Sequence, residues 1–160
     1  MSSPKQIITK FYKAFDRLDP EGMAALYDEQ IIFSDPAFGE LSGIHAGNMW
    51  RMLCKSQKGK DFRIEASNIH EENGKVMARW DAYYTFSQTG RKVHNIIYAT
   101  FEFSGNKIIR HQDHFNLYRW SIQALGFQGL LIGWSGFFKK KLQSKTRGLL
   151  SKFEEVLDQS

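Results

Sequence analysis

Two aspartates and a histidine are the side chains best suited to chemistry in this chain. Asp35 ends a short apolar run and precedes Pro36, and Asp113 follows His111 by two residues. A carboxylate at the edge of an apolar pocket is partly desolvated, so its proton affinity rises and it can take a proton from carbon. A histidine held near a carboxylate can exchange a proton with it. Asp35, Asp113 and His111 are therefore the predicted catalytic residues.

The same three residues also have a structural interpretation. Asp-Pro often opens a turn in which the aspartate caps backbone N–H groups. A buried pair of His111 and Asp113 can simply satisfy its own hydrogen bonds. Burying an aspartate among Ile109, Phe115 and Trp80 nevertheless costs free energy unless the carboxylate has a partner or a role.

Other reactive residue types do not group into a second site. His111 and His114 are three positions apart, so on a strand they face opposite sides and cannot bind one metal ion. Cys54 lies on the apolar stripe of a predicted helix, where packing accounts for it, and one cysteine forms no internal disulfide. We predict neither a metal nor a cofactor.

The elements that must position these residues begin with helices. Ser3-Pro4 predicts a helix start, apolar residues then recur at helical spacing through Leu18, and Asp19-Pro20 predicts a second, short helix. We expect a strand at 30–34, a glycine-containing loop, and a third helix at 45–56.

From residue 62 the apolar spacing changes to the two-residue alternation of strands. Strands are expected near 62–67 and over 75–87, 91–103 and 107–118, with glycine-containing turns between the last three. Strands joined by hairpins form an antiparallel meander, and helices followed by a meander predict an α+β fold.

The basic charge of the chain is concentrated in its C-terminal part. Residues 119–160 hold seven Lys or Arg against three Asp or Glu, in a chain of net charge +5. An amphipathic helix is expected over 139–157, after a glycine-rich apolar segment. No nucleic-acid-binding motif accompanies the basic residues, so we disfavour nucleic acid as a partner. We favour packing of this tail on the domain or on a partner subunit over contact with a membrane surface.

Composition limits the class of protein. The chain has 160 residues, of which 42% are hydrophobic and 14% aromatic, enough for one core and too many for a disordered chain. No segment approaches the roughly 20 apolar residues of a membrane-spanning helix, and residues 1–13 lack a signal-peptide core. We expect a cytoplasmic protein.

The order of these elements and three local motifs resemble the SnoaL-like, ketosteroid-isomerase-like branch of the nuclear transport factor two superfamily. The motifs are Leu18-Asp19-Pro20-Glu21-Gly22 followed by Ala25-Leu26-Tyr27, then Ile32-Phe33-Ser34-Asp35-Pro36, then Gly105-Asn106-Lys107-Ile108-Ile109 followed by Asp113-His114-Phe115. The resemblance covers about residues 4–118, so we expect a cone domain at 1–118 and a helical extension at 119–160. It implies a strongly curved antiparallel sheet wrapped by the N-terminal helices into a cone-shaped α+β barrel.

The resemblance also implies a small-molecule pocket on the concave face of the sheet, because members of the superfamily carry one there. The side chains assigned to it are mostly apolar: Phe11, Phe15, Phe33, Trp50, Trp80, Tyr84, Asn95, Ile97, Phe101 and Phe115. The outer face of the sheet, with Ile96 and Tyr98, is expected to form a homodimer, as it commonly does in this superfamily.

The resemblance assigns roles to both aspartates. Asp35 is similar in context to the general base of ketosteroid-isomerase-like proteins, and Asp113 to the acid/base aspartate of SnoaL-type cyclases. The chain departs from the family where Phe11 and Ala99 replace the donors that stabilise the enolate oxygen of ketosteroid isomerases. Steroid isomerisation is therefore disfavoured.

Two hypotheses remain open. One is a cofactor-independent isomerase, cyclase or hydrolase that uses aspartate acid/base chemistry on a small hydrophobic molecule, with His111 and Tyr84 positioning it. The other is a non-catalytic protein that binds a small hydrophobic ligand or docks another protein.

Overall fold

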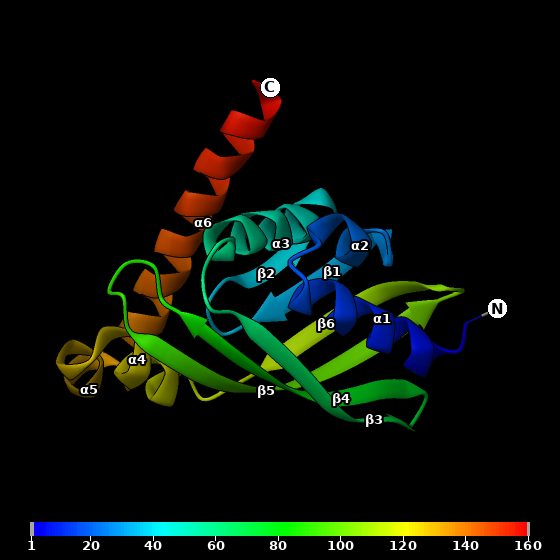
Figure 1. The fold of residues 1–160 in the computed structure, drawn as a ribbon, viewed down its shortest axis with the longest axis horizontal. Helices are drawn as coiled ribbons and strands as arrows, with labels where there is room; N and C mark the ends of the chain where they lie inside the picture. Colours follow the sequence, from blue (N-terminus) through cyan, green and yellow to red (C-terminus); the bar gives the residue numbers. More distant parts are fainter. Residues whose placement is uncertain (1, 160) are drawn as a thin grey trace.

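The computed structural model describes residues 2–159 as a curved, unclosed six-stranded sheet with helices along one side (Figure 1). The strands lie in the order β2-β1-β6-β5-β4-β3, and every neighbouring pair is antiparallel except β1 with β6. Their bounds are β1 Tyr27–Asp35, β2 Gly39–Ser42, β3 Arg63–Glu72, β4 Lys75–Thr85, β5 Lys92–Ser104 and β6 Lys107–His114. The expected α+β class, with a curved sheet and N-terminal helices, is confirmed.

Three N-terminal helices cover one face of this sheet: α1 Pro4–Asp16, α2 Pro20–Ala24 and α3 Ile44–Gln57. The side chain of Ser3 accepts from the backbone N–H of Gln6, whose own side chain accepts from Ser3, and this capping box fixes the start of α1. The apolar stripe of α1, including Ile8 and Phe11, is fully buried. This burial holds α1 against the sheet and forms much of the core.

The first two strands differ from the sequence prediction. β1 begins at Tyr27, before the expected start, and β2 forms where a loop was expected. β2 has four residues, of which only Leu41 is buried, so its alternation is too short to show in the sequence. It pairs back on β1 through a tight turn in which Asp35 lies opposite Gly39.

The alternation of β4 and β5 directs alternate side chains toward the helices, as predicted. Trp80 and Ile97 are buried there. In β6 the sequence predicted that Ile109, His111 and Asp113 face inward, and His111 and Asp113 are buried, but the prediction fails at Ile109 because the pairing with β5 is irregular near residue 103. Ile108 is therefore fully buried, whereas Ile109, which we expected to face inward, is half-buried.

The C-terminal extension folds into three helices: α4 Leu117–Leu125, α5 Phe127–Ile132 and α6 Gly136–Asp158. β6 ends at His114 because α4 begins only three residues later, with the Asn116 side chain capping Arg119. Figure 1 shows α6 leaning away from the sheet, with α4 and α5 grouped at its base. Within residues 2–159 no helix is long and apolar enough to span a membrane.

Side chains of α6 form hydrogen bonds with the turn between β1 and β2. Thr146 Oγ1 donates to the carbonyl of Ala37 at 2.8 Å, and Arg147 Nε donates to the carbonyl of Phe38 at 2.8 Å. Leu150 joins the main core. The extension therefore packs on the domain of its own chain, next to Asp35.

Candidate functional site

A cavity of about 730 Å³ lies between the covered face of the sheet and the C-terminal helices. Seven of the ten side chains assigned to a pocket from the sequence line it, namely Phe15, Trp50, Trp80, Tyr84, Asn95, Ile97 and Phe115, as do Asp35 and Asp113. The extension supplies side chains that the sequence did not assign to the pocket, among them Trp120, Phe138, Leu142 and Thr146. The cavity is thus closed on one side by the tail.

Phe11, Phe33 and Phe101 were also expected to line the pocket, but they lie in the core behind it. Each is fully buried. Their rings surround the imidazole of His111, with centroids 5.5, 5.0 and 4.2 Å from it. These three residues therefore fix the position of His111 and do not face the cavity.

His111 and Asp113 are hydrogen-bonded and buried. The Nε2 atom of His111 lies 2.9 Å from Asp113 Oδ1, and Trp80 Nε1 donates to the same oxygen at 3.3 Å. On the other side of the ring, Nδ1 lies 2.7 Å from the hydroxyl of Tyr27, which accepts from Trp50 Nε1 at 2.9 Å. The result is a continuous chain of hydrogen bonds from Trp50 to the carboxylate.

The direction of this chain follows from the chemistry of its members. An indole N–H only donates, so the Tyr27 oxygen accepts from Trp50 and has one proton to give to His111 Nδ1. The Nε2 atom then carries the imidazole proton and donates it to Asp113. Burial raises the pKa of Tyr27 well above its ordinary value of 10.0, so the phenol stays protonated. The Asp113 carboxylate is therefore an acceptor, and the hydrogen bonds from His111 and Trp80 fix its orientation.

Asp35 lies beside Asp113 on the neighbouring strand. In the parallel pairing of β1 with β6, Phe33 is opposite His111 and Ser34 is opposite Gln112, one residue before each aspartate. Adjacent strands lie about 4.8 Å apart, so this register brings the two aspartates near each other, and the charge of Asp113 contributes to the raised pKa of Asp35. Both line the cavity. The site is therefore a pair of carboxyl groups on one wall.

The proton affinity of Asp35 is raised by its surroundings. Asp35 Oδ1 accepts from the backbone N–H of Ala37 at 2.9 Å and of Phe38 at 2.6 Å. Burial raises the pKa of Asp35 to about 7, and the charge of Asp113 adds to the rise, while the two backbone hydrogen bonds oppose it. Asp35 is therefore poised to hold or release a proton near neutral pH.

A buried amide also faces the cavity. Gln57 Nε2 donates to the carbonyl of Thr85 at 3.1 Å, whereas its Oε1 is buried and has no hydrogen-bond partner in residues 2–159. The Tyr84 hydroxyl is already engaged, because it accepts from Trp120 Nε1 at 2.7 Å. Gln57 is one of the polar lining residues that sequence reasoning missed, and nothing in its helical surroundings marks it.

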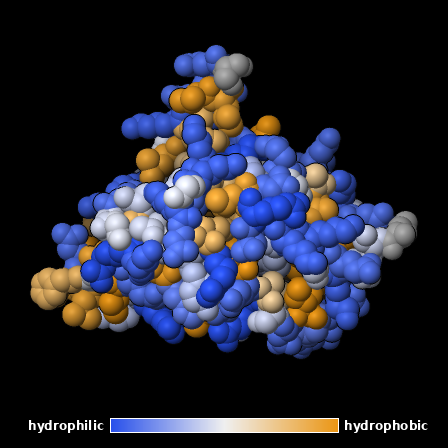
Figure 2. Space-filling model, in the orientation of Figure 1, coloured by the Kyte–Doolittle hydropathy of each residue, from blue (hydrophilic) through white to orange (hydrophobic). Residues whose placement is uncertain are grey.

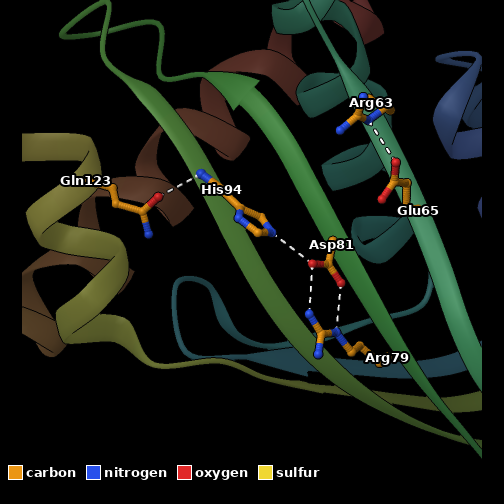
Figure 3. Close-up of polar contacts among 6 residues, drawn as sticks. All are labelled: Arg63, Glu65, Arg79, Asp81, His94 and Gln123. Atoms are coloured by element: carbon orange, nitrogen blue, oxygen red, sulfur yellow. Dashed lines mark hydrogen bonds and ion pairs between the residues drawn. The ribbon is translucent and has the colours of Figure 1, made fainter.

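The outer face of the sheet carries a second histidine–aspartate pair (Figure 3). Asp81 on β4 accepts from His94 Nε2 at 2.8 Å and from both Nε and a terminal nitrogen of Arg79, at 2.9 and 3.0 Å. The hydrogen bond from Arg79 is the main reason that the pKa of Asp81 falls to about 2. None of these three residues lines the cavity.

No cluster of three or more His, Cys, Asp or Glu side chains that could hold a metal ion occurs in the part of the chain that the structure describes.

A curved, open sheet with helices over one face defines the nuclear transport factor two class of folds. Within this class, the sequence model of the SnoaL-like domain matches residues 8–111. The chain belongs to the SnoaL-like domain family, as its motifs predicted. The match includes Asp35 and His111 and ends two residues before Asp113.

Solved structures of the same fold have low sequence identity to this chain. A protein with a ketosteroid isomerase-like fold from Catenulispora acidiphila, in complex with trimethylamine, has a TM-score of 0.62 and 13% identity over 77% of this chain and 94% of its own. A LEH-like epoxide hydrolase of M. tuberculosis has a TM-score of 0.56 and 18% identity, and the match covers 79% of this chain and 88% of the hydrolase. TerC, co-crystallised with polyporic acid, has a TM-score of 0.58 and 20% identity, and the match covers 71% of this chain and 92% of TerC. A search of curated proteins found no matching relative.

Proposed function

We propose that this protein is a cofactor-independent enzyme that moves a proton on a small, largely apolar carbonyl or epoxide-type molecule. One observation carries the proposal: Asp35 and Asp113, on neighbouring strands, both line one apolar cavity, and the charge of Asp113 acts on Asp35. Two carboxyl groups with different surroundings are what paired acid and base catalysis requires.

The roles of the two groups follow from their contacts. Asp113 accepts hydrogen bonds from His111 and Trp80, which orient it, and it serves as the base. Asp35, with its pKa raised to about 7, holds a proton near neutral pH and donates it to the substrate oxygen. On a carbonyl compound, the C–H electrons form the enol double bond as Asp113 takes the proton and Asp35 protonates the oxygen. The reverse step returns a proton to carbon.

The cavity supports the substrate class. Its walls are mainly aromatic and aliphatic, so they bind apolar surface, and the few polar groups are placed to orient one functional group. Two proteins of the same fold are an epoxide hydrolase and a protein co-crystallised with polyporic acid. Both names agree with a small organic molecule as the occupant.

The experiment is deuterium exchange at the carbon next to a carbonyl. Beta-tetralone is incubated with the protein in heavy water, and loss of the α-proton signal is followed by NMR. We expect the wild-type chain to accelerate exchange and Asp113→Asn to lower the rate by about 10²–10⁴-fold. Asp81→Asn, which changes the outer histidine–aspartate pair, is the matched control and keeps the wild-type rate.

Equal exchange by the wild-type chain and Asp113→Asn would exclude Asp113 as the base. Absence of exchange together with tight binding of beta-tetralone would favour a non-catalytic ligand-binding protein. One observation favours that second function: Asp35 Oδ1 already accepts two backbone N–H groups, as a purely structural turn residue would.

A further inference from the structure

A group of large apolar side chains is exposed at the base of the C-terminal extension. Its members, which we call the apolar tip, are Phe127, Leu130, Leu131, Trp134 and Phe137. Trp134 is 74% exposed and Phe137 is 77% exposed. Figure 2 shows hydrophobic side chains projecting where Figure 1 places α5, beside a mainly hydrophilic surface. Exposure of this many large apolar groups together marks an interaction site.

The packing of α5 forces these side chains outward. Gly129 and Gly133, four residues apart, lie directly against Ser121 of α4, and a Cβ on either glycine would collide with it. The Ser121 hydroxyl lies 3.3 Å from the carbonyl of Gly129. Because the glycine side of α5 is used for this close contact, the bulky residues occupy the opposite side. The exposure of the apolar tip is thus a result of the native packing.

The surroundings of the apolar tip are positively charged. Residues 114–153 contain seven Lys or Arg and no Asp or Glu. Lys139, Lys140 and Lys141 follow the tip directly in sequence at the start of α6, and all three are exposed. An apolar, aromatic surface beside a cluster of lysines matches the chemistry of an anionic lipid bilayer, whose headgroups are negative and whose interior is apolar.

We propose that the apolar tip and Lys139–Lys141 dock this protein on the surface of an anionic membrane. Trp134 and the phenylalanines would enter the interfacial region, where aromatic rings are favoured, while the lysines contact the headgroups. A second copy of the chain fits less well, because a symmetric contact through the same patch would bring the two lysine clusters together. The proposal does not depend on the catalytic role of the aspartates.

Docking in this way would place the cavity next to the bilayer. Gln128 and Ile132 of α5, and Lys141 of α6, line the cavity as well as belonging to the segment that carries the apolar tip. An apolar ligand dissolved in the membrane would then meet the cavity wall without crossing water.

Vesicle co-sedimentation tests the proposal. The full chain is mixed with vesicles of phosphatidylcholine alone and with vesicles in which about a third of the lipid is phosphatidylserine. We expect binding to the second kind, and its loss when the salt concentration is raised to about 0.5 M. Trp50, Trp80 and Trp120 are buried, so a blue shift of tryptophan fluorescence on binding reports mainly on Trp134.

Two pairs of variants separate the apolar and the charged contributions. Trp134→Ser with Phe137→Ser is expected to abolish binding, whereas Ile44→Ser with Val156→Ser, which changes exposed apolar residues elsewhere, leaves it intact. Lys139→Gln with Lys140→Gln is expected to weaken binding on the order of 30-fold, at about fivefold per lysine. Lys5→Gln with Lys10→Gln on α1 is the matched control.

Three results would overturn the proposal. The first is equal sedimentation with and without anionic vesicles. The second is binding that both pairs of variants at the tip leave unchanged. The third is concentration-dependent dimerisation of the wild-type chain that Trp134→Ser with Phe137→Ser abolishes, since a second copy would then cover the tip.

Discussion

The two faces of the sheet carry the same pair of residue types in different surroundings. On the covered face His111 lies 2.9 Å from Asp113, and on the outer face His94 lies 2.8 Å from Asp81. The outer pair also has Arg79, which forms two hydrogen bonds with the carboxylate. The inner pair has Tyr27 and Trp80 as neutral partners, and a cavity in front of it.

This difference shows that a histidine–aspartate pair is not by itself a sign of catalysis. Arg79 neutralises Asp81 and holds its pKa near 2, so the carboxylate has no tendency to take up a proton at neutral pH. Among residues 2–159 the only acidic side chain other than Asp113 that lines the cavity is that of Asp35, and the pKa of Asp35 rises to about 7. Within the described part of the chain, the hydrogen bonds to the Asp113 carboxylate come from His111 and Trp80 and not from an arginine, and an apolar cavity lies in front of it. These two features distinguish the candidate site.

The largest expected effect on stability comes from Asp35→Asn. The pKa of Asp35 is about 7 in the folded protein against an ordinary value of 3.8, so the folded state binds a proton that the unfolded state has lost. The free energy of unfolding therefore falls as pH rises from about 4 to 7, by up to about 4 kcal/mol. An asparagine side chain keeps an oxygen that can accept from the backbone N–H groups of Ala37 and Phe38, but it cannot ionise. Urea unfolding should show Asp35→Asn to be about 2–4 kcal/mol more stable than the wild-type chain near pH 8 and equal to it near pH 4.

Tyr27→Phe is expected to have the next largest effect. It leaves the buried Trp50 N–H and His111 Nδ1 without partners, at a cost of about 2–3 kcal/mol in unfolding free energy. Tyr84→Phe, which removes a hydroxyl that accepts from Trp120, should cost about 1 kcal/mol. In the exchange assay Tyr27→Phe should lower kcat more than it changes KM, because Tyr27 orients His111 and does not line the cavity. Equal costs for the two variants would show that the chain of hydrogen bonds adds nothing.

The smallest effect is expected on the outer face. Asp81→Asn should destabilise the protein by about 1 kcal/mol at neutral pH, since His94 and Arg79 are partly exposed and screened by water. The pKa of Asp81 is lowered in the folded protein. Its contribution to the free energy of unfolding is therefore fully present above pH 3.8 and is lost as the pH falls through about 2. Thermal unfolding at a series of pH values measures this. A stability difference between the wild-type chain and Asp81→Asn that became larger at acid pH would contradict the ion-pair account.

The faces of the long strands could be predicted from the sequence, because one buried face imposes a two-residue alternation. That pattern placed Trp80, Ile97 and Asp113 on the covered side. It failed at Ile109, where an irregularity in pairing shifts the register of β6 by one residue. Such an irregularity depends on both strands, so neither strand alone reveals it.

The candidate site was only partly predictable for a related reason. Tyr27 lies outside the strand that the sequence predicts at 30–34, so its contact with His111, 84 residues away, had no local signal. The cavity wall formed by Trp120 and Phe138 depends on how the extension folds back over the sheet. The glycines that shape α5 interrupt the apolar periodicity, and the helix could not be recognised until the close contact with Ser121 was known.

The most direct test of the account is a titration of the Asp35 carboxyl group, followed by carbon-13 NMR of labelled aspartate and assigned with Asp35→Asn. We predict that Asp35 titrates near pH 7 in the wild-type chain and at lower pH in Asp113→Asn, because the neighbouring charge is then gone. A midpoint near the ordinary value of 3.8, unchanged by that substitution, would contradict the claim that two coupled carboxyl groups share the wall of an apolar cavity.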